Sequence, residues 1–203
     1  AAGVSIIFAP SVEEMYPDGD PLIRISSGEL GTKFEGATRP GHFDGVLAVV
    51  NKFFNIIRPA AGNHPVNAYF GQKDAQQYIL IQRMVHDFNH DVTMRPVAIV
   101  REDNGLALSS RNSYLSDEER ESALVLSRTL AMLRENSLNR GFHEIDLDGA
   151  RERINSTPGV RLDYLELVDP MTFGEPTEES ERVLALVAAF VGPTRLIDNM
   201  DLR

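Results

Sequence analysis

The chain has no cysteine among its 203 residues, and it has little positive charge. Without cysteine there are no disulfides and no thiolate metal sites, which is compatible with a reducing compartment. With 20 basic and 30 acidic side chains, the net charge of −10 is opposite to what binding to a phosphate backbone requires. The longest apolar run, 183–191, is far shorter than the ~20 residues that span a bilayer. We therefore expect a cytoplasmic protein with no nucleic-acid and no membrane partner.

The remaining composition is that of an ordinary globular protein. Hydrophobic residues make up 42% and charged residues 25% of the chain. This composition and length predict a sizeable core in one or two domains. An anionic ligand would then have to be attracted by a local basic pocket, because the chain as a whole is acidic.

The most informative stretch is Phe70-Gly71-Gln72-Lys73-Asp74-Ala75-Gln76-Gln77. It joins a predicted strand, 66–70, to a predicted helix, and such junctions bind ligands in open α/β sheets. Asp74 and Gln77 have the spacing of a capping box, which would account for both residues structurally at about 1 kcal/mol. Capping does not account for Lys73, whose charge adds to the positive end of the helix dipole, so we expect an anion there. The alternative is a solvated surface lysine.

A second polar cluster follows a second predicted strand, 97–100. After a turn at 101–105, the chain continues as Leu106-Ala107-Leu108-Ser109-Ser110-Arg111-Asn112. Hydroxyl and guanidinium donors suit phosphate oxygens. The alternative is a solvated loop with Asn112 or Ser113 in a turn. Two clusters after two successive strands predict a polyphosphate held from two sides.

The periodicities predict two domains, 1–99 and 100–203, with the boundary near Ile99 to Arg101. The first combines a strand at 4–8, a mostly irregular segment at 17–40, a helix at 42–57, and a strand-helix-strand unit at 65–100 with parallel strands. This pattern is typical of half of a Rossmann-like doubly wound parallel sheet in an α/β fold. The second is predicted as a small α+β domain with an antiparallel sheet, with helices at 116–136 and 148–155 and strands at 160–168, 182–191 and 195–197.

Three ordered motifs identify a family. They are Glu35-Gly36-Ala37-Thr38-Arg39-Pro40-Gly41-His42-Phe43-Asp44-Gly45-Val46, the 70–77 stretch, and Asp103-Asn104-Gly105-Leu106 continuing to Asn112. Together they resemble pantothenate synthetase (pantoate–beta-alanine ligase), and the match runs in order from 7–17 through the C-terminal region. The resemblance implies a nucleotidyltransferase type of Rossmann-like domain.

The resemblance also implies the reaction. ATP and pantoate would form pantoyl adenylate and pyrophosphate, and beta-alanine would then attack the acyl carbon to give pantothenate, a coenzyme A precursor, and AMP. Mg²⁺ is expected with ATP, and a homodimer is expected as the assembly.

Site residues follow from the same resemblance. Lys73, Ser109, Ser110 and Arg111 would act on the phosphates, Gly71 would let the backbone approach the nucleoside, and Asp74 would accept from the ribose. Gln77 would bind pantoate, and Arg39 and His42 would border the site. Arg39 and His42 flank Pro40-Gly41 at a helix start, so a turn or capping role is an equal alternative.

One departure from the family pattern concerns the N-terminal side. The family carries a His-x-Gly-His motif in a segment ahead of the region matched here, together with the groups nearest the metal, and no such motif occurs in this sequence. We therefore expect the C-terminal part of a longer enzyme, with little activity in isolation, and assign no metal ligands. The alternatives are another adenylate-forming nucleotidyltransferase and a non-catalytic fragment that binds a nucleotide or dimerises.

Overall fold

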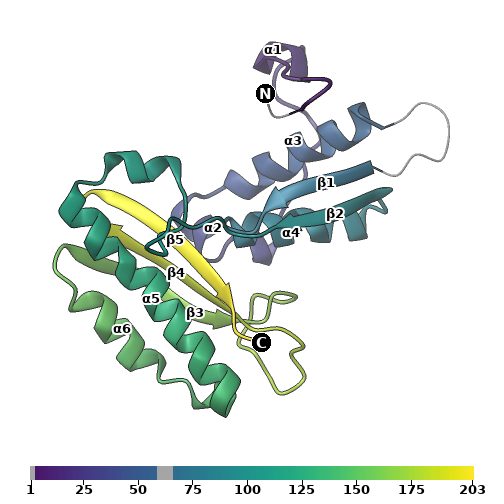
Figure 1. Cartoon of the computed structure of the whole chain (residues 1–203). Helices are drawn as coiled ribbons and strands as arrows, with labels where there is room; N and C mark the ends of the chain where they lie inside the picture. The colour runs from purple at the N-terminus through teal and green to yellow at the C-terminus, as the bar shows by residue number, and fades with distance from the viewer. Residues whose placement is uncertain (1–2, 59–65) are drawn as a thin grey trace.

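The computed structural model describes residues 3–58 and 66–203, which form two lobes (Figure 1). The N-terminal lobe contains a two-stranded sheet, and the C-terminal lobe contains a three-stranded sheet. In chain order the elements are α1 (Val12–Met15), η1 (Glu29–Gly31), α2 (Glu35–Thr38), α3 (His42–Ile56), β1 (Val66–Gly71), α4 (Ala75–Asp87), β2 (Val92–Val97), η2 (Ser110–Tyr114), α5 (Asp117–Arg140), η3 (Phe142–Glu144), α6 (Leu147–Asn155), β3 (Val160–Val168), β4 (Leu184–Val191) and β5 (Thr194–Asp201).

The N-terminal lobe is built on the predicted strand-helix-strand unit. β1 and β2 pair in parallel, with Val66 opposite Val92, and α4 connects them. The buried face of α3, which includes Phe43 and Phe54, packs with α4 and with side chains of both strands into one cluster. The predicted α/β class is confirmed, because the amphipathic periods of α3 and α4 can be buried only against the sheet and each other.

Two strand predictions in this lobe are wrong. The second strand is Val92–Val97 and not 97–100, where Val97 and Val100 are 43% and 60% exposed. β2 pairs with β1 alone among the described strands, and such an edge tolerates the missing N–H of Pro96. The segment 4–8 is extended but pairs with no described strand, and Ile6 is 84% exposed. Its apolar composition is typical of a strand, but composition provides no pairing partner.

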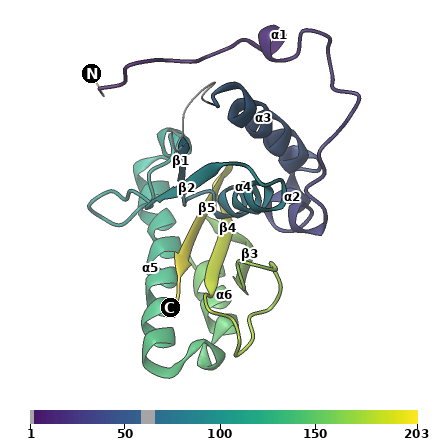
Figure 2. The ribbon, with the colours of Figure 1, turned by 90° about the vertical axis from the view of Figure 1, so that its right-hand side faces the viewer.

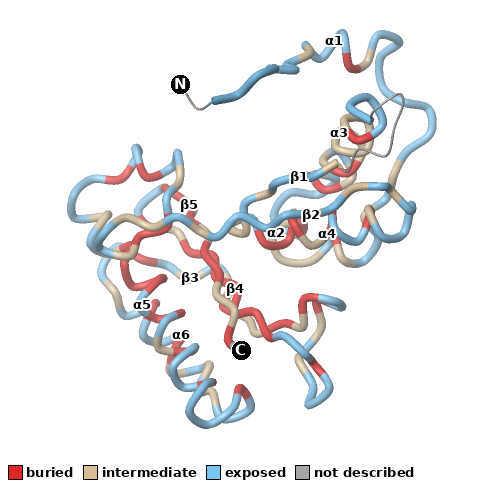
Figure 3. Tube along the Cα trace, turned by 45° about the vertical axis from the view of Figure 1, so that its right-hand side comes forward, coloured by how far each residue is buried: buried red, intermediate tan, exposed pale blue. Residues whose placement is uncertain are grey.

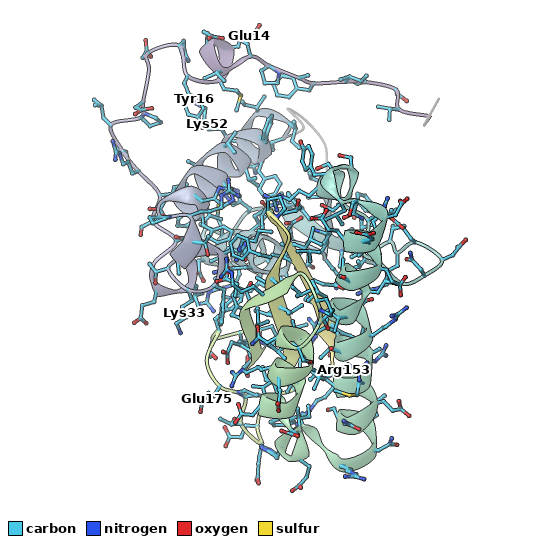
Figure 4. The ribbon with its side chains drawn as sticks, turned by 90° about the vertical axis from the view of Figure 1, so that its left-hand side faces the viewer. Glu14, Tyr16, Lys33, Lys52, Arg153 and Glu175 are labelled. Atoms are coloured by element: carbon cyan, nitrogen blue, oxygen red, sulfur yellow. The ribbon has the colours of Figure 1, made fainter. Side chains whose placement is uncertain are left out.

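The segment before α2 contains little regular structure, as predicted. α1 begins with a capping box between Ser11 and Glu14. The segment runs along the outside of the lobe (Figure 2). There the Lys52 ammonium of α3 lies 4.8 Å from the ring centroid of Tyr16 (Figure 4). Both residues are partly buried, and a cation over an aromatic face contributes modestly at such a position.

The C-terminal lobe is an antiparallel sheet in the order β3-β4-β5, with α5 and α6 along one face (Figure 1). The predicted capping box at the start of α5 is confirmed, since Ser116 and Glu119 cap each other's backbone N–H groups. α5 continues to Arg140, four residues past the predicted end, and stops where Gly141 has a φ of 89°. β5 is longer than the predicted 195–197 because it pairs along the whole of β4.

β4 is buried on both faces, and this determines how the lobes meet (Figure 3). Its odd-numbered residues, from Ala185 to Val191, pack against α5 and α6. Leu184 and Leu186 point the other way and pack with Ala75 at the start of α4. A strand covered on both faces reads as a continuous apolar run rather than an alternating one. α4 and α2 accordingly lie beside the ends of β4 and β5 (Figure 2).

An ionic network fastens α2 to the C-terminal sheet. The Arg195 guanidinium donates to both carboxylate oxygens of Glu35 at 2.7 Å and to Asp163 at 2.8 Å. Tyr164 donates its hydroxyl to Glu35 at 3.0 Å. Burial, followed by the neighbouring Glu35 carboxylate, raises the pKa of Tyr164. Burial opposes the charge of Arg195, but its bonds to Glu35 and Asp163 raise its pKa on balance.

The predicted boundary between the two domains lies near Ile99 to Arg101, just past the end of β2. We keep this boundary as a proposal.

Replacing Arg195 tests this network. Arg195→Met leaves the Glu35 carboxylate, 16% exposed, beside Asp163 without a cation. We expect the free energy of unfolding to fall by roughly 3 kcal/mol, the scale of stranding a buried charge. Urea denaturation measures the change. The control is Arg83→Met, which breaks an exposed pair with Asp87 and should lower the free energy of unfolding much less. Equal costs for the two variants would contradict a structural role of the network.

Candidate functional site

A cavity lies between the two lobes at the C-terminal end of β1. The polar side chains around it come from α2 and α3, the loop into α4, η2, and the strands of the C-terminal sheet. They are Glu35, Arg39, His42, Lys73, Asp74, Gln76, Gln77, Arg111, Tyr164, Asp198 and Asn199, with Phe43, Ala75, Leu186 and Ile197 as the apolar part.

The cavity brings together most of the residues singled out from the sequence. Arg39, His42, Lys73, Asp74, Gln77 and Arg111 all line it. Ser109 lines a small adjoining cavity together with Lys73, and its hydroxyl accepts from the Arg111 N–H at 3.2 Å. Gly71 and Ser110 line neither of these two cavities, and Ser110 is exposed at the start of η2. The lysine loop and the arginine loop therefore meet at one site.

Charge is distributed unevenly around the cavity. Two of its carboxylates are paired with arginines that do not line it: Glu35 with Arg195, and Asp198 with Arg101 at 2.7 and 3.0 Å. Among residues 3–58 and 66–203, no ion pair joins Arg39, Lys73 or Arg111 to a carboxylate. The cavity is thus locally cationic in an acidic chain, and Asp74 is the one described carboxylate in its lining outside those pairs.

The alternative in which the Asp74 side chain caps the helix is wrong, although the expected N-cap position is confirmed. Asp74 occupies the N-cap position of α4, but its side chain makes no capping hydrogen bond. Its ψ of 66° departs from the extended backbone that aims an N-cap side chain back at the helix. The carboxylate is instead exposed at the cavity, where it can accept from a ligand.

Gln76 has a structural role that sequence reasoning missed. It is 4% exposed, and its amide donates to the carbonyl oxygens of Leu30 at 2.8 Å and Lys33 at 2.9 Å. Its oxygen accepts from the Glu35 N–H at 3.1 Å, so it ties the segment before α2 to α4. The sequence signal was its place four residues before Leu80, on the buried face of α4.

Gly36 is required by the same segment. A Cβ at this position would collide with the carbonyl oxygen of Gly31. Glycine therefore allows the close approach that places Glu35 and Arg39 at the cavity.

His42 is held neutral in the cavity wall. Its Nε2 lies 3.0 Å from Nη1 of Arg39, which can only donate, so Nε2 is the acceptor. Burial and, secondly, the Arg39 charge lower the pKa of His42 from 6.5, with partial opposition from Glu35 and Asp74. An uncharged imidazole thus orients a cation at this edge.

The size of the cavity limits what it encloses. Its volume is about 80 Å³, far below the roughly 300–1,000 Å³ of sites that surround a drug-sized ligand. A volume of this size accommodates a group about as large as a phosphate. A larger cavity of about 760 Å³ lies along α4 between Leu30, His86 and Met171, but its one arginine, Arg83, is paired with Asp87.

Neither a metal-binding cluster nor a membrane-crossing helix is found among residues 3–58 and 66–203. No cluster of three or more histidine, aspartate or glutamate side chains there is arranged to hold a metal ion. No described helix combines the length and hydropathy of a membrane-crossing segment.

Comparison with known proteins decides the family. The profile of the family described as pantoate-beta-alanine ligase matches residues 1–201. The chain belongs to this ligase family. A pantothenate synthetase of Corynebacterium glutamicum (strain R) is 51% identical over 99% of the chain and 70% of the relative. One from Paenarthrobacter aurescens (strain TC1) is 49% identical over 100% and 72%.

Solved structures of ligase family members agree in fold. The pantothenate synthetase of Thermus thermophilus superposes with a TM-score of 0.86 at 42% identity, covering 98% of the chain and 70% of that structure. The pantoate-beta-alanine ligase of Francisella tularensis, in complex with beta-gamma ATP and beta-alanine, has a TM-score of 0.67 at 32% identity, covering 93% and 61%.

The environment of His42 gives a prediction. Arg39→Met removes the nearby charge, so the pKa of His42 should rise while burial still opposes protonation. NMR titration of the imidazole resonances measures the pKa, with the other four histidines as internal references. Because the unfolded chain protonates His42 before the folded one does, its contribution to stability decreases as the pH falls below about 6.5. An unchanged or lower pKa would contradict the contact.

Proposed function

We propose that the protein makes pantothenate from pantoate, beta-alanine and ATP through a pantoyl-adenylate intermediate, at the cavity between the lobes. Family membership carries the overall ligation. The complex of the Francisella tularensis relative with beta-gamma ATP and beta-alanine supports the same substrates here.

The observation that carries the placement is the convergence of three cations on one cavity. Arg39, Lys73 and Arg111 come from three separate segments and have no carboxylate partner among the described residues. Three such cations converging on one cavity, in a chain of net charge −10, favour an anionic ligand at that cavity. The cavity's dimensions fit a phosphate group.

The proposed roles follow from position. Lys73 and Arg111 contact the phosphates from two loops, and Arg39, oriented by His42, completes the cationic wall. Asp74 accepts from the ribose, and Gln77 binds pantoate. Gly71 is the point of close approach of the nucleoside, and Ser109 and Ser110 donate to outer phosphate oxygens.

The chemistry requires alignment and charge stabilisation rather than a covalent nucleophile of the protein. A carboxylate oxygen of pantoate attacks the α-phosphorus of ATP, and pyrophosphate leaves. The beta-alanine amine then attacks the acyl carbon, loses a proton, and expels AMP. Since both reactants of the first step are anions, cations held in place lower their repulsion and stabilise charge on the phosphates.

Three further expectations belong to this proposal. Mg²⁺ accompanies ATP, the assembly is a homodimer, and the location is cytoplasmic. Another adenylate-forming nucleotidyltransferase activity or a non-catalytic nucleotide-binding role is the competing hypothesis, and a screen of carboxylate substrates for pyrophosphate release separates them.

Lys73→Ala is the direct test. Loss of one charge-stabilising group should reduce pantoate-dependent pyrophosphate release by roughly 10²-fold and weaken ATP binding measured by calorimetry. The control is Lys52→Ala, which removes an ammonium over Tyr16, away from the cavity, and should leave both quantities unchanged. Unaltered ATP affinity and rate in Lys73→Ala would remove Lys73 from the site.

Gly71→Ala separates ligand approach from folding. A Cβ on Gly71 meets no atom within 4 Å, and its φ lies outside the left-handed region, so nothing within the described protein requires glycine there. We expect the thermal unfolding midpoint to stay the same or rise, because alanine restricts the unfolded chain. ATP affinity should fall if the nucleoside approaches this backbone. Full ATP affinity in Gly71→Ala would place the nucleoside elsewhere.

A further inference from the structure

The main chain of the Lys73 loop is held by a residue from the other lobe. The loop Gln72–Asp74 lies between β1 and α4. Its N-terminal side is fixed by the Gln72 N–H, which donates to the Val97 carbonyl at 2.9 Å. The Asp74 side chain makes no capping bond that would brace the other side.

Asn199 of β5 braces that other side. Its Nδ2 donates to the carbonyl oxygens of Gln72 and Lys73, both at 2.9 Å. These two bonds use both hydrogens of the amide, and the side chain is 6% exposed. Two carbonyls on successive residues are thus satisfied by one side chain more than 120 positions away in sequence.

Asn199 is itself held in place. It pairs with Leu186 in the β4–β5 ladder, and its N–H donates to the Asp198 carboxylate at 2.8 Å. Asp198 accepts two bonds from Arg101, which lies just past the end of β2. The amide that holds the Lys73 loop therefore belongs to a strand that is paired with β4 along its whole length.

We propose that Asn199 is a positioning residue that determines where the Lys73 ammonium lies relative to the ATP phosphates. This inference rests on the proposed function. A lysine side chain is flexible, so the placement of its charge depends on its main chain. Displacement by about 1 Å can cost a reaction roughly 10²-fold. The C-terminal lobe thus acts on the phosphates through the lysine of the N-terminal lobe.

The test uses Asn199→Leu, which keeps the branching and the number of heavy side-chain atoms but removes both donors, and Asn199→Asp, which turns an anion toward the two carbonyls. We expect ATP affinity by calorimetry to fall roughly 10-fold or more in both. Hydrogen–deuterium exchange should increase in peptides covering 70–77. Asn155→Leu, which removes a side-chain bond to the Leu162 N–H far from the cavity, should change neither. If the Leu variant does not fold, Asn199→Ala also removes both donors without adding an apolar group and should give the same losses.

A double-mutant cycle distinguishes positioning from general stability. If Asn199 acts through Lys73, adding Asn199→Leu to Lys73→Ala should weaken ATP binding by less than about twofold further. A merely structural role would give additive losses, which would overturn the inference. If Asn199→Leu leaves ATP affinity and hydrogen–deuterium exchange unchanged while Lys73→Ala weakens ATP binding, the positioning role of Asn199 is overturned and the proposed function is not. Unchanged affinity in Lys73→Ala would overturn the proposed function, and this inference with it.

Discussion

The two-sided burial of β4 is the constraint on which the site depends. One face of this strand forms the core with α5 and α6, and the other receives the start of α4. The cavity walls come from both lobes, so they exist as a site only while the second face stays covered. Apolar packing supplies the driving force for this contact without specifying an orientation. The orientation is specified by polar bonds around its edge.

Those polar bonds also sort the charges. Glu35 and Asp198 would oppose an anionic ligand if they were free, but each is paired with an arginine behind the wall. The Glu35–Arg195 pair also joins the lobes, since it connects α2 to β5, and the Asp198–Arg101 pair connects β5 to the segment after β2. Structural pairing of the acids thus leaves Arg39, Lys73 and Arg111 to dominate the local potential, even though the chain is acidic overall.

Local sequence signals predicted individual helices, but they did not predict which strands pair or where a side chain points. The Ser116–Glu119 capping box and the amphipathic periods of α3 and α4 involve neighbours within one or two turns, and these predictions are confirmed. The strand expected at 97–100 failed because four apolar residues carry no information about which edge they pair with. The segment 4–8 failed for the same reason. Asp74 fits the N-cap position in sequence, but its backbone dihedral decides whether the side chain caps.

The residues of the site also differ in whether local sequence signals could predict them. Lys73 and Arg111 were found because chemistry-bearing residues clustered within short motifs. Gln76, Arg195 and Asn199 were missed because their partners lie 41 to 160 positions away. No periodicity in one sequence connects an asparagine just past a predicted strand, 195–197, to a loop in another lobe. The residues that would touch ligand are therefore readable from local composition, whereas those that hold them become visible only when the chain is folded. Because side chains from both lobes share one small cavity, a change in the packing of β4 would move the groups on its two sides relative to each other and alter the site without touching any residue of the motifs.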